Sequence, residues 1–125
     1  MSTRPLALVI DDYDDTREMY AEVLRLEGFS VEGASDGQEG LQKAVELLPD
    51  IIITDLYMPI MDGRETIQRL RADERTRRIP IIACTGGEAP SSAHDWSADV
   101  LLAKPCPLDT LLLEVRQLLR RSAAA

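Results

Sequence analysis

The residue best placed to carry chemistry is an aspartate at the end of a short apolar run. The run Ile51-Ile52-Ile53-Thr54 is β-branched and too short for a helix, which favours a strand buried on both faces. It ends at Asp55, after which Pro59 and the pair Asp62-Gly63 predict a loop. Open α/β sheets place their ligand chemistry at the carboxyl ends of strands. A cap of the next helix is the alternative role for Asp55, but the proline-containing loop separates it from that helix.

Four further polar residues stand at the ends of other predicted strands. Asp11 and Asp12 follow the first strand, Thr85 ends the fourth, and Lys104 follows the fifth. All strands of a parallel sheet end at the same edge, so these residues are expected beside Asp55. Three carboxylates this close repel one another by several kcal/mol per pair at an effective dielectric constant of about 20. The cluster therefore requires a cation, and its hard oxygen ligands favour Mg²⁺ or Mn²⁺ over zinc. A merely solvated acidic cluster is the alternative.

The lysine and the threonine indicate phosphoryl chemistry. Lys104 offers a cation and Thr85 a hydroxyl donor, and both suit the oxygens of a phosphoryl group. An aspartate carboxylate can attack phosphorus and form an acyl phosphate. Because phosphoryl transfer depends mainly on positioning and charge neutralisation, the metal, the lysine and the hydroxyl would supply most of what it needs. Gly86 would leave its backbone N–H open to a phosphate oxygen.

Strand and helix patterns alternate along the whole chain. Strands are predicted at 6–10, 29–34, 51–55, 79–85 and 100–103. The helices between and after them have apolar faces at Met19, Tyr20, Val23 and Leu24; at Leu41, Ala44, Val45 and Leu48; at Ile67 and Leu70; and at Leu108, Leu111, Leu112, Val115, Leu118 and Leu119. This alternation predicts an α/β domain: a five-stranded parallel sheet with helices on both faces.

Boundary signals support these helices. Gly28 is placed to end the first one, and Asp36 with Glu39 resembles a capping box that begins the second. Arg75, Arg77 and Arg78 form a basic turn that we expect to be solvated. The core is expected to span 5–121, with a frayed tail at 122–125.

Composition narrows the class of protein. A chain of 125 residues makes one domain, and its net charge of −8 argues against a dedicated nucleic-acid surface. Cys84 and Cys106 form no zinc motif, and Cys84 is expected to be a small core residue. No signal peptide and no apolar run of membrane-spanning length is present, which predicts a cytoplasmic protein without a membrane partner.

The polar residues and their order resemble the receiver domains of two-component response regulators, across essentially the full length of the chain. The resemblance is carried by Val9-Ile10-Asp11-Asp12, by 54–63 (TDLYMPIMDG), by Thr85 and by Lys104-Pro105. Each motif is weak alone, but the set is highly specific. The resemblance implies a flavodoxin-like strand order, 2-1-3-4-5, in a single receiver domain over 1–125.

The resemblance also implies a role for each site residue. Asp55 would be the phosphoacceptor, phosphorylated by a histidine kinase or a histidine phosphotransfer protein. Asp12, Asp55 and the backbone carbonyl of Tyr57 would ligate Mg²⁺, with Asp11 acting largely through water. Thr85 and Lys104 would contact the phosphoryl group, and a cis peptide would precede Pro105. Such a module signals by binding a downstream protein and is not a turnover enzyme.

Two features depart from the family pattern. The segment between Thr85 and Lys104 is shorter than usual and rich in glycine, proline and serine, so we expect the helix there to be short or irregular. Leu101 occupies the position of the usual aromatic residue, which puts the usual threonine–aromatic coupling in doubt.

Trp96 is expected in the core and His94 on the surface. Tyr57 and Gly87 flank the expected phosphoryl position.

Three other functions fit the sequence less well. A phosphohydrolase of the haloacid dehalogenase type would need a second aspartate at the position of Tyr57. A flavodoxin-like cofactor carrier would need a first loop rich in Ser, Thr and Gly, but the acidic stretch 11–15 would repel a phosphate. A degenerate receiver that acts as a constitutive protein-interaction module remains the main alternative.

Overall fold

The computed structural model describes residues 4–86 and 96–124. Its strands are β1 (Leu6–Ile10), β2 (Ser30–Ala34), β3 (Ile51–Asp55), β4 (Ile81–Thr85) and β5 (Val100–Ala103). Its helices are α1 (Asp14–Leu26), α2 (Gly37–Leu47), α3 (Gly63–Ala72) and α4 (Leu108–Ala124). The helix expected between Thr85 and Lys104, together with Gly87 and His94, lies outside the described residues.

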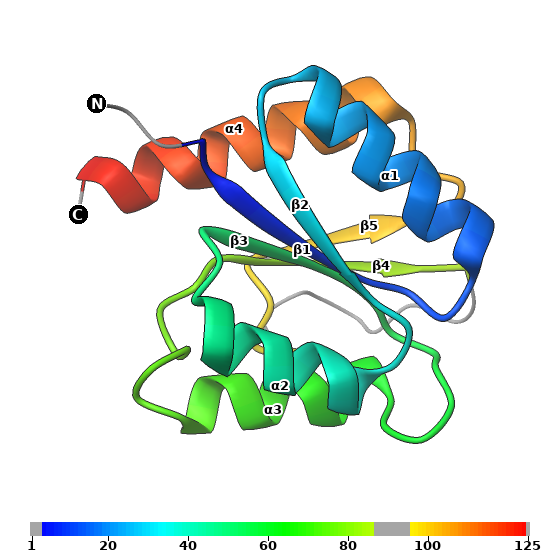
Figure 1. Cartoon of the computed structure of the whole chain (residues 1–125), viewed down its shortest axis with the longest axis vertical. Helices are drawn as coiled ribbons and strands as arrows, with labels where there is room; N and C mark the ends of the chain where they lie inside the picture. Colours follow the sequence, from blue (N-terminus) through cyan, green and yellow to red (C-terminus); the bar gives the residue numbers. More distant parts are fainter. Residues whose placement is uncertain (1–3, 87–95, 125) are drawn as a thin grey trace.

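The five strands form one parallel sheet in the order β2-β1-β3-β4-β5, which confirms the predicted fold. In Figure 1, α1 and α4 cover one face of the sheet, and α2 and α3 cover the other. No helix in the described part of the chain is long and apolar enough to cross a membrane.

Each face of the sheet has its own hydrophobic core. On one face, alternate residues of the central strands, such as Val9 and Ile53, pack with Leu24 of α1 and Leu111 of α4. On the other, their neighbours Ile10 and Ile52 pack with residues of α2 and α3, namely Ala44, Ile67 and Leu70. Because β1, β3 and β4 are covered on both sides, every residue of Ile51–Thr54 is buried, as the unbroken apolar run predicted.

The ends of the helices follow the sequence signals. Asp36 caps α2 by accepting a hydrogen bond from the backbone N–H of Glu39 at 2.8 Å, and the Glu39 carboxylate accepts one from the N–H of Ser35. Gly28 follows α1 with φ of +97°, a left-handed conformation that suits glycine. Asp62, predicted only as part of a loop, caps α3 through the N–H of Glu65 at 2.9 Å.

Several predicted details are wrong. Met19 is 44% exposed, because α1 instead turns Ala21 toward the sheet beside Tyr20 and Leu24. Leu48 is also exposed, because α2 ends at Leu47 and Leu48 takes a left-handed conformation. β4 begins at Ile81 rather than Ile79. α4 continues to Ala124, so the part of the tail that the structure describes is helical.

Candidate phosphoryl and metal site

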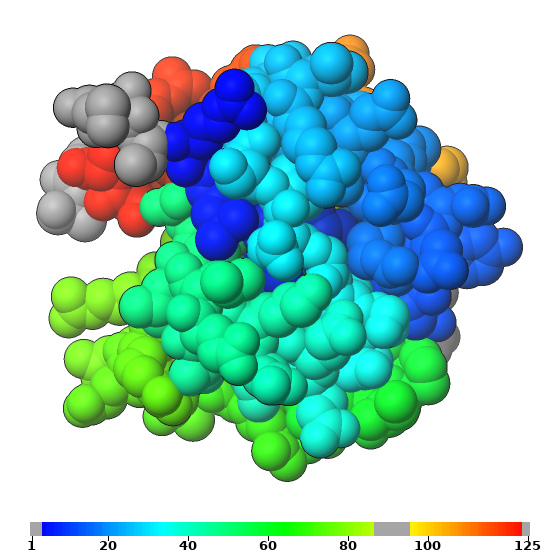
Figure 2. Space-filling model, viewed as in Figure 1, coloured from blue at the N-terminus to red at the C-terminus, as the bar shows by residue number. Residues whose placement is uncertain are grey.

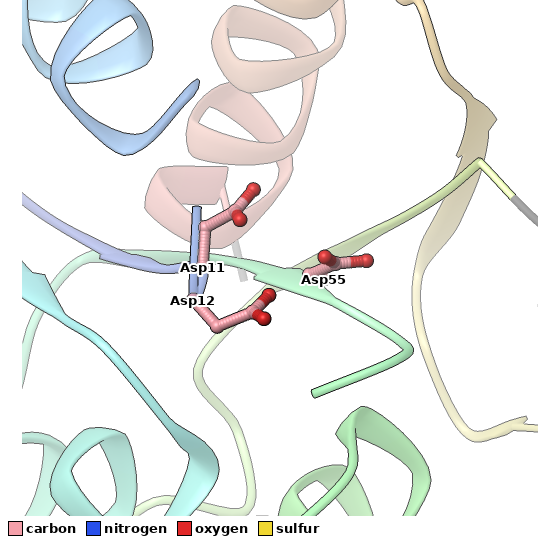
Figure 3. A group of neighbouring side chains, drawn as sticks. All are labelled: Asp11, Asp12 and Asp55. Carbon is pink, nitrogen blue, oxygen red and sulfur yellow. The ribbon is translucent and has the colours of Figure 1, made fainter. Parts of the chain in front are cut away.

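The predicted site residues lie together at the carboxyl edge of the sheet. Asp11 and Asp12 follow β1, Asp55 is the last residue of β3, Thr85 is the last residue of β4, and Lys104 follows β5. The neighbouring strands β1 and β3 bring the three aspartates side by side (Figure 3). One carboxylate oxygen from each of the three lies within 4.8 Å of the others. The sheet topology therefore assembles the acidic cluster that the strand ends predicted.

Asp11 is the buried anchor of the cluster. Its side chain is only 3% exposed, and its two oxygens are both held: one accepts from the backbone N–H of Tyr13 at 2.9 Å, the other from Lys104 Nζ at 2.8 Å. The Arg17 guanidinium donates to the backbone carbonyl of Asp11 at 2.8 Å and pairs with Asp14. The sequence pattern did not predict this support by Arg17.

Asp55 is oriented by backbone and by charge. One carboxylate oxygen accepts from the N–H of Leu56 at 2.8 Å and, more weakly, from that of Tyr57 at 3.4 Å. The other lies 3.3 Å from Lys104 Nζ. Lys104 thus bridges Asp11 and Asp55, and the peptide bond between Lys104 and Pro105 is cis, as expected. Asp12, in contrast, is exposed.

The pKa values of the bridging pair reflect this environment. Burial raises the pKa of Asp55 above its ordinary value; the attraction of Lys104 opposes this rise and the negative charge of Asp11 adds to it. For Lys104, burial lowers the pKa, but the hydrogen bond and charge of Asp11, together with Asp55, raise it overall. Lys104 is therefore charged at neutral pH, and ionised Asp55 carries an electrostatic cost that a cation would relieve.

This cost predicts a pH-dependent effect of Asp55→Asn on stability. The folded-state pKa of Asp55 lies above the unfolded-state value near 3.8, so folding favours the protonated form. The stability that folding gains from protonated Asp55 is fully present below the unfolded-state pKa. It is lost as the pH rises through the folded-state pKa. A neutral asparagine escapes this loss. In EDTA, we expect Asp55→Asn to melt at a higher temperature than the wild type at about pH 7, with the difference shrinking toward about pH 4.

Thermal melts followed by circular dichroism across this pH range would measure the effect. The buffer must be free of divalent cations, because a metal that binds the folded state would stabilise the wild type by mass action. A melting difference that is the same at every pH would contradict the proposed origin in the ionisation of Asp55.

The donor set fits a hard divalent cation. Three carboxylates from Asp11, Asp12 and Asp55 converge, and the exposed Asp12 leaves one side of the cluster open to water. Mg²⁺ characteristically combines one or two protein carboxylates with several waters. Among the residues that the structure describes, no thiol or imidazole lies in the cluster. Cys84 is buried in the core, as predicted, and burial raises the pKa of its thiol to about 12. Oxygen chemistry therefore defines the site.

Residues around the cluster differ in exposure. Thr85 is buried at the end of β4, whereas the Tyr57 side chain is half exposed beside the acceptor loop. Leu101 and Trp96 both pack, partly buried, against the core under α2 and α3. The expectation that Trp96 contributes to the core is thus confirmed, and the Arg64 guanidinium lies 5.4 Å from the centre of its ring.

Comparisons with known proteins agree with this geometry. The family model of the response regulator receiver domain matches residues 7–116. Over 121 residues, the chain is 40% identical to the DNA-binding dual master transcriptional regulator RpaA of Synechocystis sp., covering 94% of this chain and 50% of that protein. It is 37% identical over 120 residues to the transcriptional regulatory protein PrrA of Mycobacterium tuberculosis, covering 95% and 52%. The chain spans about half the length of the curated relatives it matches.

The chain is also similar to a solved structure over nearly the full length of both chains. The chemotaxis response regulator CheY4 of Vibrio cholerae superposes with a TM-score of 0.85 at 32% identity, covering 93% of this chain and 99% of that one.

Proposed function

Because the chain belongs to the response regulator receiver domains, we propose that it accepts a phosphoryl group on Asp55 from the phosphohistidine of a histidine kinase or a histidine phosphotransfer protein. The observation that carries this proposal is the position of the Asp55 carboxylate, which is oriented by backbone N–H groups and lies 3.3 Å from Lys104. Receiver domains are signalling domains, and we propose that this one catalyses no turnover beyond its own phosphorylation and dephosphorylation.

The transfer itself is a substitution at phosphorus. An Asp55 carboxylate oxygen forms the new O–P bond as the P–N bond to the donor imidazole breaks, and that imidazole leaves with the electron pair of the P–N bond. Asp11 holds Lys104 at the site, so the ammonium group can pair with a phosphoryl oxygen once the Asp55 oxygen becomes part of the acyl phosphate. We assign Thr85, at the end of the adjacent strand, to a second phosphoryl oxygen.

Asp11, Asp12, Asp55 and the backbone carbonyl of Tyr57 would hold Mg²⁺, with Mn²⁺ as a substitute of the same ligand preference. The cation would neutralise charge on the incoming phosphoryl group. The supporting observation is the convergence of three carboxylate oxygens within 4.8 Å. Without a cation, the negative charge of this cluster would repel the anionic phosphoryl group of the donor.

Metal dependence provides the first test. The wild-type chain, incubated with phosphoramidate and Mg²⁺, is expected to gain the mass of one phosphoryl group, whereas excess EDTA should abolish the gain. The measurement is intact-mass spectrometry, with circular dichroism to show that EDTA leaves the chain folded. If the folded wild type gains no phosphoryl group from phosphoramidate with any divalent cation present, the proposal is rejected. That result would favour a degenerate receiver that binds its partner constitutively.

Output would follow from the new charge. An acyl phosphate places about two negative charges beside Lys104 and Thr85, and this would bias the domain between two arrangements with different partner-binding surfaces. With Leu101 at the position of the usual aromatic residue, we propose that the response does not use the common threonine–aromatic coupling. The downstream partner would be a protein recognised through this phosphorylation-sensitive surface.

Tyr57 is expected to control how long the phosphoryl group lasts. Its half-exposed ring follows the acceptor by two positions, and its N–H points to the Asp55 carboxylate. We expect Tyr57→Ala to admit water more readily and to speed spontaneous dephosphorylation by a few-fold. The measurement is the decay of the phosphorylated species by intact mass after the phosphodonor is removed. An unchanged decay rate would show that the ring does not screen the acyl phosphate.

A further inference from the structure

A cleft lies at the edge of the sheet opposite the phosphoacceptor. This cleft has a volume of about 910 Å³ and is bounded by the loop before β4, the turn before β5 and the C-terminal half of α4. In Figure 2, the yellow-green loop before β4 and the red end of α4 project separately at the left side of the molecule. Its lining includes four arginines: Arg71, Arg77, Arg78 and Arg121.

Arg71 builds the cleft by tying its walls together. Its guanidinium donates to the carbonyls of Arg77 and Ile79 at 2.8 and 2.7 Å, which hold the loop before β4. It also donates to the carbonyl of Ser97 at 3.0 Å and pairs with Asp99 at 2.9 Å, which hold the turn before β5. These contacts use four of the five guanidinium N–H groups of Arg71, so its role is structural.

The acidic groups at this edge are also engaged. Asp99 accepts from the backbone N–H of Ile81 at 2.8 Å in addition to its pair with Arg71. Asp50, in an adjoining recess of about 340 Å³, accepts from the N–H of Leu6 at 2.7 Å. Among the described residues, neither carboxylate forms an ion pair with the other arginines of the cleft.

Three arginines of the cleft lining therefore carry charges that no ion pair in the described residues compensates. Within residues 4–86 and 96–124, no ion pair is formed by Arg77, Arg78 or Arg121, and all three residues are exposed. A guanidinium stays protonated at every physiological pH, so these are permanent charges. Their concentration contrasts with the net charge of −8 of the whole chain and with the acidic cluster at the opposite edge.

We propose that this cleft binds a small molecule that carries two or more linked phosphate groups. Guanidinium forks match phosphate oxygens in a bidentate manner and form charge-assisted hydrogen bonds with them. The volume lies within the range of small-ligand sites, between roughly 300 and 1,000 Å³. Such a ligand would connect the loop before β4 to α4, which both contribute residues to the lining of the cleft.

Linked phosphates fit the arrangement better than an acidic peptide does. They concentrate several charges in one compact group that can reach the three guanidiniums that line one concave site. In an extended acidic peptide, successive carboxylates point to opposite faces, so only alternate ones would reach the cleft. A nucleoside triphosphate and inorganic tripolyphosphate share the required chemistry, and the experiment separates them.

Isothermal titration calorimetry of the full chain with sodium tripolyphosphate, at low ionic strength and in EDTA, tests the proposal. We expect saturable binding with one molecule per chain. Arg121→Gln should weaken it by about fivefold, and the triple change Arg77→Gln, Arg78→Gln, Arg121→Gln by more than tenfold, as loss of charge-assisted hydrogen bonds predicts. ATP titrated in the same way shows whether the nucleoside adds affinity.

Arg25→Gln provides the matched control. Arg25 is exposed on α1 and does not line the cleft. Arg25→Gln therefore removes one positive charge, as Arg121→Gln does, but should leave the affinity for tripolyphosphate unchanged. Equal weakening by this control, or no binding by the folded wild type, would overturn the proposal. So would a hexaglutamate peptide that competes as strongly as tripolyphosphate, because that result would assign the cleft to acidic peptides.

The outcome is separable from the function proposed for Asp55. The cleft shares no residue with the acidic cluster, so Asp55→Asn should bind tripolyphosphate as the wild type does. Conversely, the triple arginine variant should still be phosphorylated by phosphoramidate. Loss of tripolyphosphate binding in Asp55→Asn would place the polyphosphate at the acidic site through some other contact and would overturn the cleft assignment.

Discussion

The Asp55→Asn variant is expected to gain no phosphoryl group from phosphoramidate under conditions in which Mg²⁺ supports labelling of the wild type. The amide is nearly the same size as the carboxylate and can still accept the N–H of Leu56, so the loop geometry should survive. It lacks the nucleophilic anion, however, and an amide oxygen is a poor attacking group at phosphorus. The expected effect is therefore complete loss of labelling, measured as the absence of the phosphorylated mass after prolonged incubation.

Asp62→Asn is the matched control for this substitution. Asp62 lies in the loop that follows the acceptor, and its side chain caps α3 through the N–H of Glu65. Asparagine caps a helix as well as aspartate does, so this variant should fold and become labelled like the wild type. Labelling that persists in Asp55→Asn would show that a different residue accepts the phosphoryl group, and peptide mapping would identify it.

The parallel sheet and its functional edge could be predicted because the sequence marks where the strands end. The buried strand Ile51–Asp55 is a β-branched run that ends in a charged residue, and the same change from apolar to polar marks the ends of β1, β4 and β5. In a parallel sheet, these ends must meet at one edge, so the candidate site followed from the fold without any knowledge of distances. The strand order itself rested on the family resemblance and is confirmed by the pairing of β1 with β2 and β3.

Details that depend on tertiary contacts were beyond the reach of the sequence pattern. Helical periodicity placed Met19 with Tyr20 on one apolar stripe, but the rotation of α1 against the sheet favours the smaller Ala21 and leaves Met19 exposed. The roles of Arg17 and Arg71 rest on hydrogen bonds to backbone carbonyls, and periodicity carries no information about such acceptors. From the sequence alone, an arginine on a helix surface is interpreted as solvated, whether or not the fold brings a backbone carbonyl within its reach.

A glycine next to the acceptor shows how closely the site depends on packing. Gly63 begins α3, and its N–H donates to the carbonyl of Leu56 at 2.8 Å. A Cβ at this position would lie 2.3 Å from the carbonyl oxygen of Asp55 and 2.6 Å from the Cα of Leu56. Both are backbone atoms at the end of the central strand, so no side-chain rotation can relieve the overlap.

Gly63→Ala is therefore expected to lower the free energy of unfolding by about 2 to 3 kcal/mol, the upper part of the range for overpacking. Gly86→Ala is the control: Gly86 also lies beside the site, but its added Cβ would make only an ordinary contact, 3.6 Å from the Cβ of Lys104. Urea denaturation in EDTA measures both values. If the two variants are equally stable, the start of α3 can move away from β3 at little cost.

The same variant tests whether the position of the acceptor matters for chemistry. To make room for the Cβ, α3 or the end of β3 must shift, and a shift of the strand end moves the two N–H groups that orient the Asp55 carboxylate. Because small displacements of a reacting group can cost orders of magnitude in rate, we expect Gly63→Ala to be phosphorylated at least tenfold more slowly by phosphoramidate, under conditions where it remains folded. A normal rate in a destabilised variant would mean that α3 yields and the strand end does not, so that β3 alone fixes the acceptor.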